Sequence, residues 1–183
     1  QVQSDVDLLS QIGEYNLALA SGAFGYSLNG WNKIVRDALA NTVRPVYKIP
    51  LDTITNDNIY HQVEAFEFNL PKILDSKIKF IVMSKKNLKR YRIRYRQLWS
   101  TSVDYDENKR VKSPLDGRAL IGLDNLADDI IFATVDGNML NLIDTIDNPP
   151  KFTDVQVQDY KVKMFMEFWK GYDFLINEAV CVA

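Results

Sequence analysis

The chain has 183 residues, of which 46% are hydrophobic and 25% are charged, and its net charge at neutral pH is −2. These values are typical of about one globular domain, large enough to bury a core without covalent staples, and a net negative charge does not support general polyanion binding. One cysteine and one histidine exclude an internal disulfide, a four-cysteine zinc cluster and any site that needs several imidazoles.

The first 28 residues have weak helical periodicity, and residues 21–25 interrupt it with glycines. Because the chain begins with Gln1 rather than Met, we expect it to be a processed or trimmed product. It contains no apolar run of about 18 residues, so we expect no membrane span.

The first strong helix is predicted over residues 31–39, with Asn29 as its N-cap. Its apolar residues recur at i, i+3, i+4, i+7 and i+8, which places them on one face. These residues are Trp31, Ile34, Val35, Ala38 and Leu39.

A second helix is expected from Asp57 to Asn69, capped by Thr55 or Asn56 and followed by Pro71. Its apolar face is formed by Ile59, Val63, Phe66 and Leu70.

Residues 77–83 alternate between apolar and polar side chains, which is typical of a half-buried strand with Ile78, Phe80 and Val82 inward. Ser84 is expected to cap a third helix that runs to about Trp99. The inward residues of this helix are Leu88, Tyr91, Tyr95 and Leu98. Residues 90–96 also alternate with period two, so a strand is the alternative there, but the cap and the helical spacing favour the helix.

Residues 100–117 are polar and are predicted to form a loop. Strands are expected at 119–123 and 130–134, on either side of the acidic turn 124–129. A long alternating strand is expected from Val155 to Phe168, and strand-like sequence continues at 172–176 and 178–182. Within that last unit, Gly171 is expected to turn or bulge the chain. Together the elements predict an α+β fold with a mixed sheet, about three flanking helices and long C-terminal strands.

The basic segment from Lys85 to Arg96 is the most prominent charged feature. Seven cations lie within about three helical turns: Lys85, Lys86, Lys89, Arg90, Arg92, Arg94 and Arg96. Because Tyr91 and Tyr95 lie among them, a nucleic-acid-binding module is one interpretation. The favoured interpretation is a solvated face or a subunit interface, in which arginines pair with carboxylates.

The acidic turn is the second candidate, through Asp124, Asp128 and Asp129. Carboxylates of this kind can bind magnesium or calcium, but the spacing is not that of an EF-hand, and such turns usually bond their own backbone. Asp104, Asp106 and Glu107 form another acidic stretch with the same interpretation. His61 is predicted on the outer side of its helix and Cys181 in a buried strand. We therefore expect no enzyme, no metal, no cofactor and no small-molecule substrate.

The order of short motifs from about Gly30 to Ala183 resembles that of tailed-bacteriophage major capsid proteins, which have the Hong Kong phage-type fold. The motifs are Gly30–Ile34, Leu51–Ile59, Leu70–Pro71, Met83–Ser84, Tyr91, Asp116–Gly117, Gly122–Leu123, Asp129–Ala133, Gly137–Asn138, Gly171–Tyr172 and Glu178–Val180. The resemblance implies that residues 29–150 form the A-domain, which lies at the capsomer axis, and that residues 151–183 form C-terminal P-domain strands. Residues 1–28 are too short to contain an N-terminal arm, an extended loop and a spine helix, and would be a remnant of the spine helix or a linker.

The resemblance also implies a function. The expected role is a structural subunit of an icosahedral phage or prophage capsid that encloses DNA, with other copies of itself as partners in pentamers and hexamers. Weak contact with packaged DNA is expected, as is a location in the virion, after assembly in the bacterial cytoplasm. An encapsulin-type shell around cargo proteins is the alternative within the same fold. The candidate interface residues are Lys86, Lys89, Arg90, Arg92, Arg94, Arg96, Asp124, Asp128 and Asp129.

Overall fold

The computed structural model describes residues 2–19, 24–143, 151–158, 161–167 and 169–183. The α-helices are α1 (Val2–Ile12), α2 (Trp31–Ala40), α3 (Ile59–Phe68), α4 (Lys72–Asp75) and α5 (Lys85–Trp99). The strands are β1 (Tyr47–Lys48), β2 (Ile78–Ser84), β3 (Val111–Lys112), β4 (Ala119–Leu123), β5 (Ile131–Val135), β6 (Met139–Ile143), β7 (Lys151–Gln158), β8 (Lys161–Glu167), β9 (Lys170–Phe174) and β10 (Val180–Val182). Within these ranges, no helix has the length and apolar character needed to cross a membrane.

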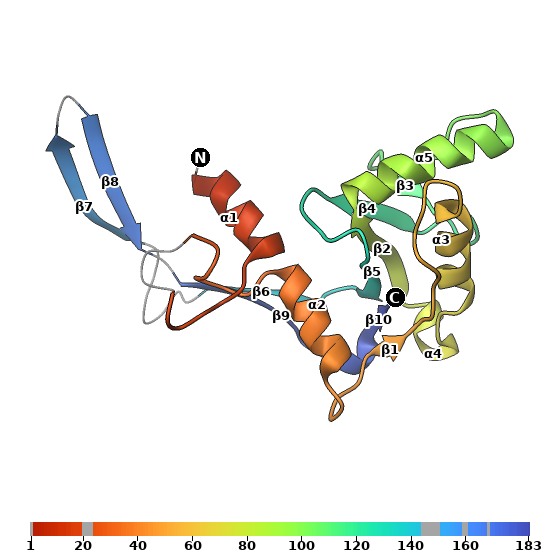
Figure 1. The fold of residues 1–183 in the computed structure, drawn as a ribbon, viewed down its shortest axis with the longest axis horizontal. Coiled ribbons are helices and arrows are strands. Elements are labelled where there is room, and N and C mark those ends of the chain that lie inside the picture. Colours follow the sequence, from red (N-terminus) through yellow and green to blue (C-terminus); the bar gives the residue numbers. More distant parts are fainter. Residues whose placement is uncertain (1, 20–23, 144–150, 159–160, 168) are drawn as a thin grey trace.

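A mixed six-stranded sheet forms the centre of the fold, in the order β1-β10-β5-β2-β4-β3 (Figure 1). Strand β2 pairs parallel with β4, where Val82 is in register with Ile121, and antiparallel with β5 on its other side. The C-terminal strand β10 lies between β1 and β5, so the end of the chain is inside the sheet. The predicted α+β fold with a mixed sheet is confirmed, with five α-helices in the described ranges where about three were expected.

Both faces of the central strands of this sheet are buried, because helices cover each of them (Figure 1). Ile81 and Met83 of β2 pack on one face with Phe66 of α3 and residues of α5. Val82, which points the other way, packs with Val35 of α2. The prediction of a half-buried strand is confirmed at the start of β2, where Ile78 is buried and Lys79 is exposed, and is wrong from Ile81 onward, because that part of the strand is covered on both sides.

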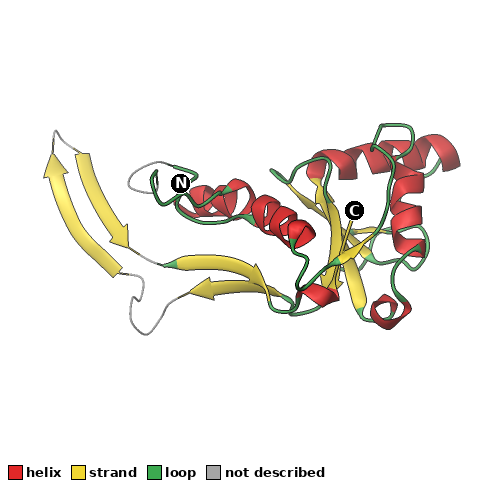
Figure 2. Ribbon diagram, turned by 60° about the horizontal axis from the view of Figure 1, so that its bottom comes forward, coloured by secondary structure: helices red, strands yellow, loops and turns green. Residues whose placement is uncertain are grey.

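The strands near the C-terminus form two smaller antiparallel pairs, β6 with β9 and β7 with β8, and the second pair projects from the rest of the molecule (Figures 1 and 2). The predicted single strand from Val155 to Phe168 is thus two strands, because β8 turns back to pair with β7. Two of its predicted residues, Tyr160 and Phe168, lie outside the described residues. Gly171 is neither a turn nor a bulge, since it lies within β9 in regular register with Leu142.

Two of the predicted helix N-caps were wrong, as the hydrogen bonds at the starts of α2 and α3 show. The N-cap of α2 is Gly30, and the side chain of Asn29 instead accepts a hydrogen bond from the backbone N–H of Tyr15, 2.8 Å away. The N-cap of α3 is Asn58, whose side-chain Oδ1 accepts a hydrogen bond from the backbone N–H of Thr55, while its own backbone N–H donates to Thr55 Oγ1. In both cases a polar side chain near the helix stabilises the preceding turn and not the first helical turn.

Two further segments differ from the sequence-based expectation. The weakly periodic N-terminal region contains a regular helix, α1, and the N–H of Gly30 donates to the carbonyl of Gly13 just beyond its end, at 2.8 Å. A Cβ at Gly30 would lie 2.6 Å from the carbonyl oxygen of Leu9, so only glycine fits where α1 and α2 meet. The predicted loop at 100–117 contains the short strand β3, which pairs with β4.

Candidate functional site

Helix α5 begins at the expected cap, and that cap also holds the acidic turn. Ser84 Oγ accepts a hydrogen bond from the backbone N–H of Asn87 at 3.1 Å and donates one to Asp128 Oδ1 at 2.6 Å. The side-chain amide of Asn87 donates to the backbone carbonyl of Asp128 at 2.8 Å. A carboxylate is thereby fixed at the positive end of a helix, which stabilises its charge.

Cations of the same helix complete the environment of Asp128. Lys86 and Arg90 both form ion pairs with its carboxylate. Partial burial alone would raise the pKa of Asp128, but hydrogen bonds from Lys86 and Ser84, with the charges of Lys86 and Arg90, lower it below its usual value. Asp128 therefore remains ionised at neutral pH.

The other two aspartates of the turn also form ion pairs within the chain. Asp124 lies 2.7 Å from Lys85 of α5, and Asp129 lies 3.6 Å from Arg36 of α2. The acidic turn thus connects α5 to α2. The sequence predicted both charged clusters, and the structure shows that part of the basic cluster and the acidic turn contact each other in one molecule.

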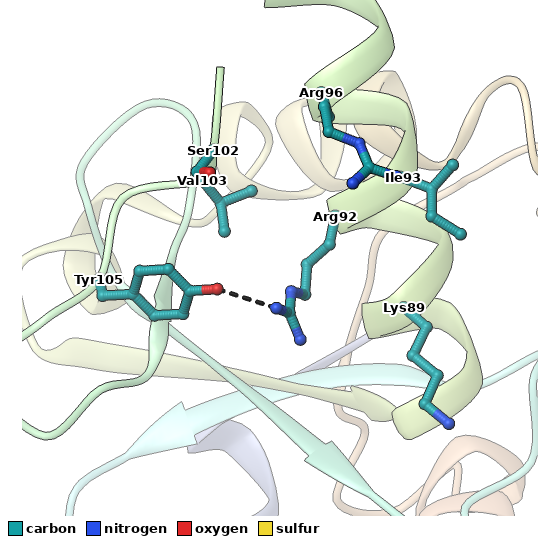
Figure 3. Close-up of a pocket in the computed structure, with 7 residues that line it drawn as sticks. All are labelled: Lys89, Arg92, Ile93, Arg96, Ser102, Val103 and Tyr105. Atoms are coloured by element: carbon teal, nitrogen blue, oxygen red, sulfur yellow. Dashed lines mark hydrogen bonds between the residues drawn. The ribbon is translucent and has the colours of Figure 1, made fainter. Parts of the chain in front are cut away.

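The remaining predicted cations lie elsewhere on α5. Arg94 approaches Asp57, at 3.8 Å. Lys89, Arg92 and Arg96 are exposed and line a pocket of about 270 Å³ between α5 and the segment after it (Figure 3). The other residues that line it are Ile93, Ser102, Val103 and Tyr105.

Within this pocket, Arg92 is held in place by Tyr105. Its Nη2 donates to the phenol oxygen at 2.9 Å, and its guanidinium carbon lies 5.9 Å from the centre of the ring (Figure 3). The hydrogen bond and the cation–π contact both restrict the conformation of the Arg92 side chain. The inward predictions for α5 are confirmed for Tyr91, which is fully buried, whereas Leu98 is 39% exposed.

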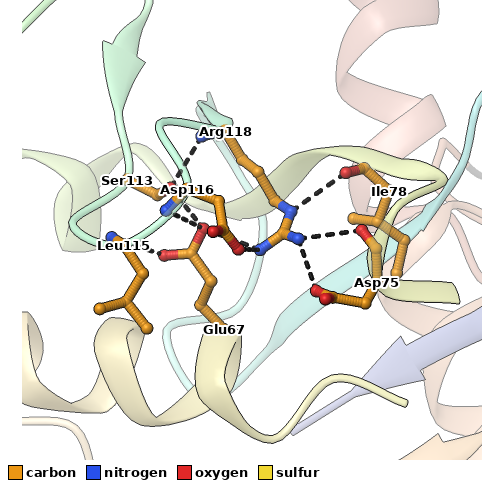
Figure 4. A network of polar contacts seen from close by, with 7 residues as sticks. All are labelled: Glu67, Asp75, Ile78, Ser113, Leu115, Asp116 and Arg118. Atoms are coloured by element: carbon orange, nitrogen blue, oxygen red, sulfur yellow. Dashed lines mark hydrogen bonds and ion pairs between the residues drawn. The ribbon is translucent and has the colours of Figure 1, made fainter. Parts of the chain in front are cut away.

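Sequence reasoning missed a buried polar network around Arg118 (Figure 4). The guanidinium of Arg118 pairs with Glu67 at 2.9 Å and with Asp75 at 2.6 Å, and its Nε donates to the carbonyl of Ile78. The Glu67 carboxylate, fully buried, also accepts hydrogen bonds from Ser113 Oγ and from the backbone N–H of Leu115. A salt bridge of this kind fixes a loop on α3 and provides no open coordination or reaction site.

Within the described ranges, no group of three or more His, Cys, Asp or Glu side chains is positioned to hold a metal ion. His61 is exposed and faces Glu64, as predicted for a surface residue. Burial raises the pKa of the Cys181 thiol to about 12, so this cysteine is protonated and unreactive at neutral pH.

Comparison with known proteins gives matches among solved structures. No protein-family model and no curated sequence matches the chain. A chain in the procapsid of satellite phage P4, in a structure that includes the size determination protein Sid, aligns with 99% of this chain at a TM-score of 0.59 and 11% identity. The chain has the fold of a phage capsid protein.

Two further matches are weaker. A virus-like particle from Pyrococcus furiosus aligns with 81% of this chain at 10% identity, and the capsid of an empty GTA particle with 98% at 12%, both at a TM-score of 0.45. We draw no inference from these two. This chain spans 62% of the length of the P4 procapsid chain, 58% of the Pyrococcus furiosus chain and 60% of the GTA capsid chain.

Proposed function

We propose that the chain is part of a structural subunit that builds an icosahedral phage capsid around DNA. The observation that carries the proposal is the alignment of nearly the whole chain, 99%, with a chain of the P4 procapsid. The charged residues of α5 and the acidic turn are consistent with this role, since they form ion pairs and hydrogen bonds with one another and with Tyr105. In this proposal the protein is not an enzyme and its partners are other copies of itself.

The proposal assigns parts of the chain to parts of the subunit. Residues 29–150 form the A-domain next to the capsomer axis, residues 151–183 contribute P-domain strands, and residues 1–28 are a remnant of the spine helix or a linker. The subunit assembles in the bacterial cytoplasm and resides in the virion, where its contact with packaged DNA is weak. The candidate interface residues on α5 and the acidic turn belong to the A-domain in this scheme.

Negative-stain electron microscopy of the product of the complete gene tests the proposal. Closed shells, or rings of five and six subunits, are the expected result. Dispersed small particles at high protein concentration would contradict it. Nuclease treatment followed by extraction of protected nucleic acid then separates a DNA-filled capsid from a shell that encloses proteins.

A further inference from the structure

Helix α5 has cations on two faces, and they have different partners. Lys86 and Arg90 face the carboxylate of Asp128. Lys89, Arg92 and Arg96 follow one another at i, i+3 and i+7, so they share another face of the helix. Across the described residues, no carboxylate lies within ion-pair distance of these three.

The unpaired face forms one wall of a pocket, and its positive charges favour an oxyanion as ligand. The pocket has a volume of about 270 Å³, and its apolar lining residues are the buried Val103 and the half-exposed Ile93 (Figure 3). Tyr105 already restricts Arg92, so less conformational entropy is lost when a ligand binds. Arginine forks of this kind bind carboxylate groups in a bidentate manner.

Carboxylates without a side-chain partner lie close by along the chain. Asp104 and Glu107 are exposed, and the structure gives neither side chain an ion pair within the described ranges. Asp104 lines a different hollow, together with Tyr95 and Trp99 of α5. Trp99 is 59% exposed, and an exposed aromatic beside a charge is typical of a protein–protein interface.

We propose that the pocket on one copy receives the carboxylate of Asp104 or Glu107 of a neighbouring copy, in a head-to-tail contact around a capsomer axis. This inference rests on the proposed function. In a ring generated by rotation, each copy presents one side to the copy before it and another side to the copy after it. The pocket and Asp104 lie in different hollows beside α5, so one can face the preceding copy while the other faces the following copy.

A nucleic acid fits this pocket less well than an acidic protein segment. The phosphate backbone requires cations along a continuous track, whereas four of the seven cations of α5 are paired with carboxylates of their own chain. The net charge of −2 does not attract a polyanion over a distance either. The local charge pattern favours a carboxylate partner.

Zero-length cross-linking of the assembled product of the complete gene tests the contact. A carbodiimide joins a lysine amine to a carboxylate only when the two touch, and an equal mixture of ¹⁴N- and ¹⁵N-labelled subunits distinguishes links between copies from links within one. We expect mixed-isotope peptides that join Lys89 to Asp104 or Glu107. Rings or shells without this link, or with this link only inside single chains, would overturn the inference and leave the proposed function intact. Absence of any assembly would overturn both.

A charge exchange provides the second test. Replacement of Arg92 and Arg96 by Glu, or of Asp104 and Glu107 by Arg, should each weaken self-association by about tenfold or more, and the combination should restore it. Arg44→Glu, at an exposed position outside this region, is the matched control and should assemble normally. Circular dichroism checks that each variant is folded. If the combination fails to restore assembly while the arginine variants lose DNA binding at low salt, the pocket binds phosphate and the inference is wrong.

Discussion

Glu67 of α3 and Arg118 of the segment before β4 form an ion pair of 2.9 Å in which both side chains are shielded from water (Figure 4). They are 51 residues apart in the sequence, so the pair joins α3 to the loop that leads into β4. Removal of water from two charges is costly, and the pair is tolerated because each partner satisfies the other and further hydrogen bonds satisfy the rest.

We expect Glu67→Ala to lower the free energy of unfolding by about 3–5 kcal/mol, because Arg118 would remain buried without the one of its three carboxylate partners that is fully buried. Urea denaturation at neutral pH measures this loss. Asp116→Asn is the control, since Asp116 pairs with Arg118 but is 56% exposed, and it should cost about 1 kcal/mol or less. An equal loss for the two variants would show that burial does not determine the strength of this network.

Gly122 of β4 lies where the strand and α5 come into close contact. A Cβ there would meet Leu88 Cδ2 at 2.9 Å and the backbone Cα of Lys85 at 3.1 Å. A backbone atom can move away only if the helix itself shifts. Gly122→Ala should therefore destabilise the protein by about 1–3 kcal/mol in thermal or urea unfolding.

Gly171→Ala is the matched control for this close approach. Gly171 is also a strand glycine, but the nearest atom to an added Cβ, Leu142 Cβ, is 3.9 Å away, an ordinary contact. This substitution should be neutral or slightly stabilising. A comparable loss at both positions would mean that the cost comes from the strand backbone and not from contact with α5.

Local signals explain what the sequence could predict. The cap of α5 could be read because Ser84 bonds the N–H of Asn87 three residues away, and α2 because its apolar residues repeat with the helical period. Such features depend on neighbours within one or two turns. The strands β4 and β5 were found for a similar reason, since each is a short apolar run next to a turn.

Long-range pairing explains what the sequence could not show. Burial of β2 on both faces depends on α2, which precedes it, and on α5, which follows it. The site has the same limit: Lys86 and Asp128 were each recognised as members of a charged cluster, but the sequence does not show that these two residues, 42 positions apart, are partners. The pocket is lined by Lys89, Arg92 and Arg96, the cations of α5 that form no such pair within the described residues.

Asn138, in the predicted Gly137–Asn138 motif, connects the turn before β6 to the segment before β10. Its side-chain amide donates to Thr134 Oγ1 at 2.7 Å and to the carbonyl of Ile176 at 2.9 Å, and its Oδ1 accepts from the N–H of Ile176 at 2.7 Å. Asn138→Ala would leave these buried groups without partners, and we expect a loss of about 1–3 kcal/mol or more in urea unfolding. Asn141→Ala, at an exposed position of β6, is the control and should change stability by less than about 0.5 kcal/mol. Equal effects would show that the Asn138 bonds do not stabilise the fold.

The Asp128 cluster should make stability depend on pH. Partial burial alone would raise the pKa of Asp128, but hydrogen bonds from Lys86 and Ser84, with the charges of Lys86 and Arg90, lower it in the folded protein below its ordinary value of 3.8. A group whose pKa falls on folding contributes stability at pH values above its unfolded pKa and loses that contribution as the pH falls through its folded pKa.

Asp128→Asn should therefore be less stable than the parent chain at pH 7. The difference should be about 1 kcal/mol or less, because the carboxylate is partly exposed. The stabilities of the two proteins should converge as the pH falls below the ordinary pKa of the carboxyl group. Urea unfolding at a series of pH values measures the difference, and Asp124→Asn, in a more exposed pair, should show a smaller one. A stability difference for Asp128→Asn that does not change between neutral and acidic pH would contradict an electrostatic origin.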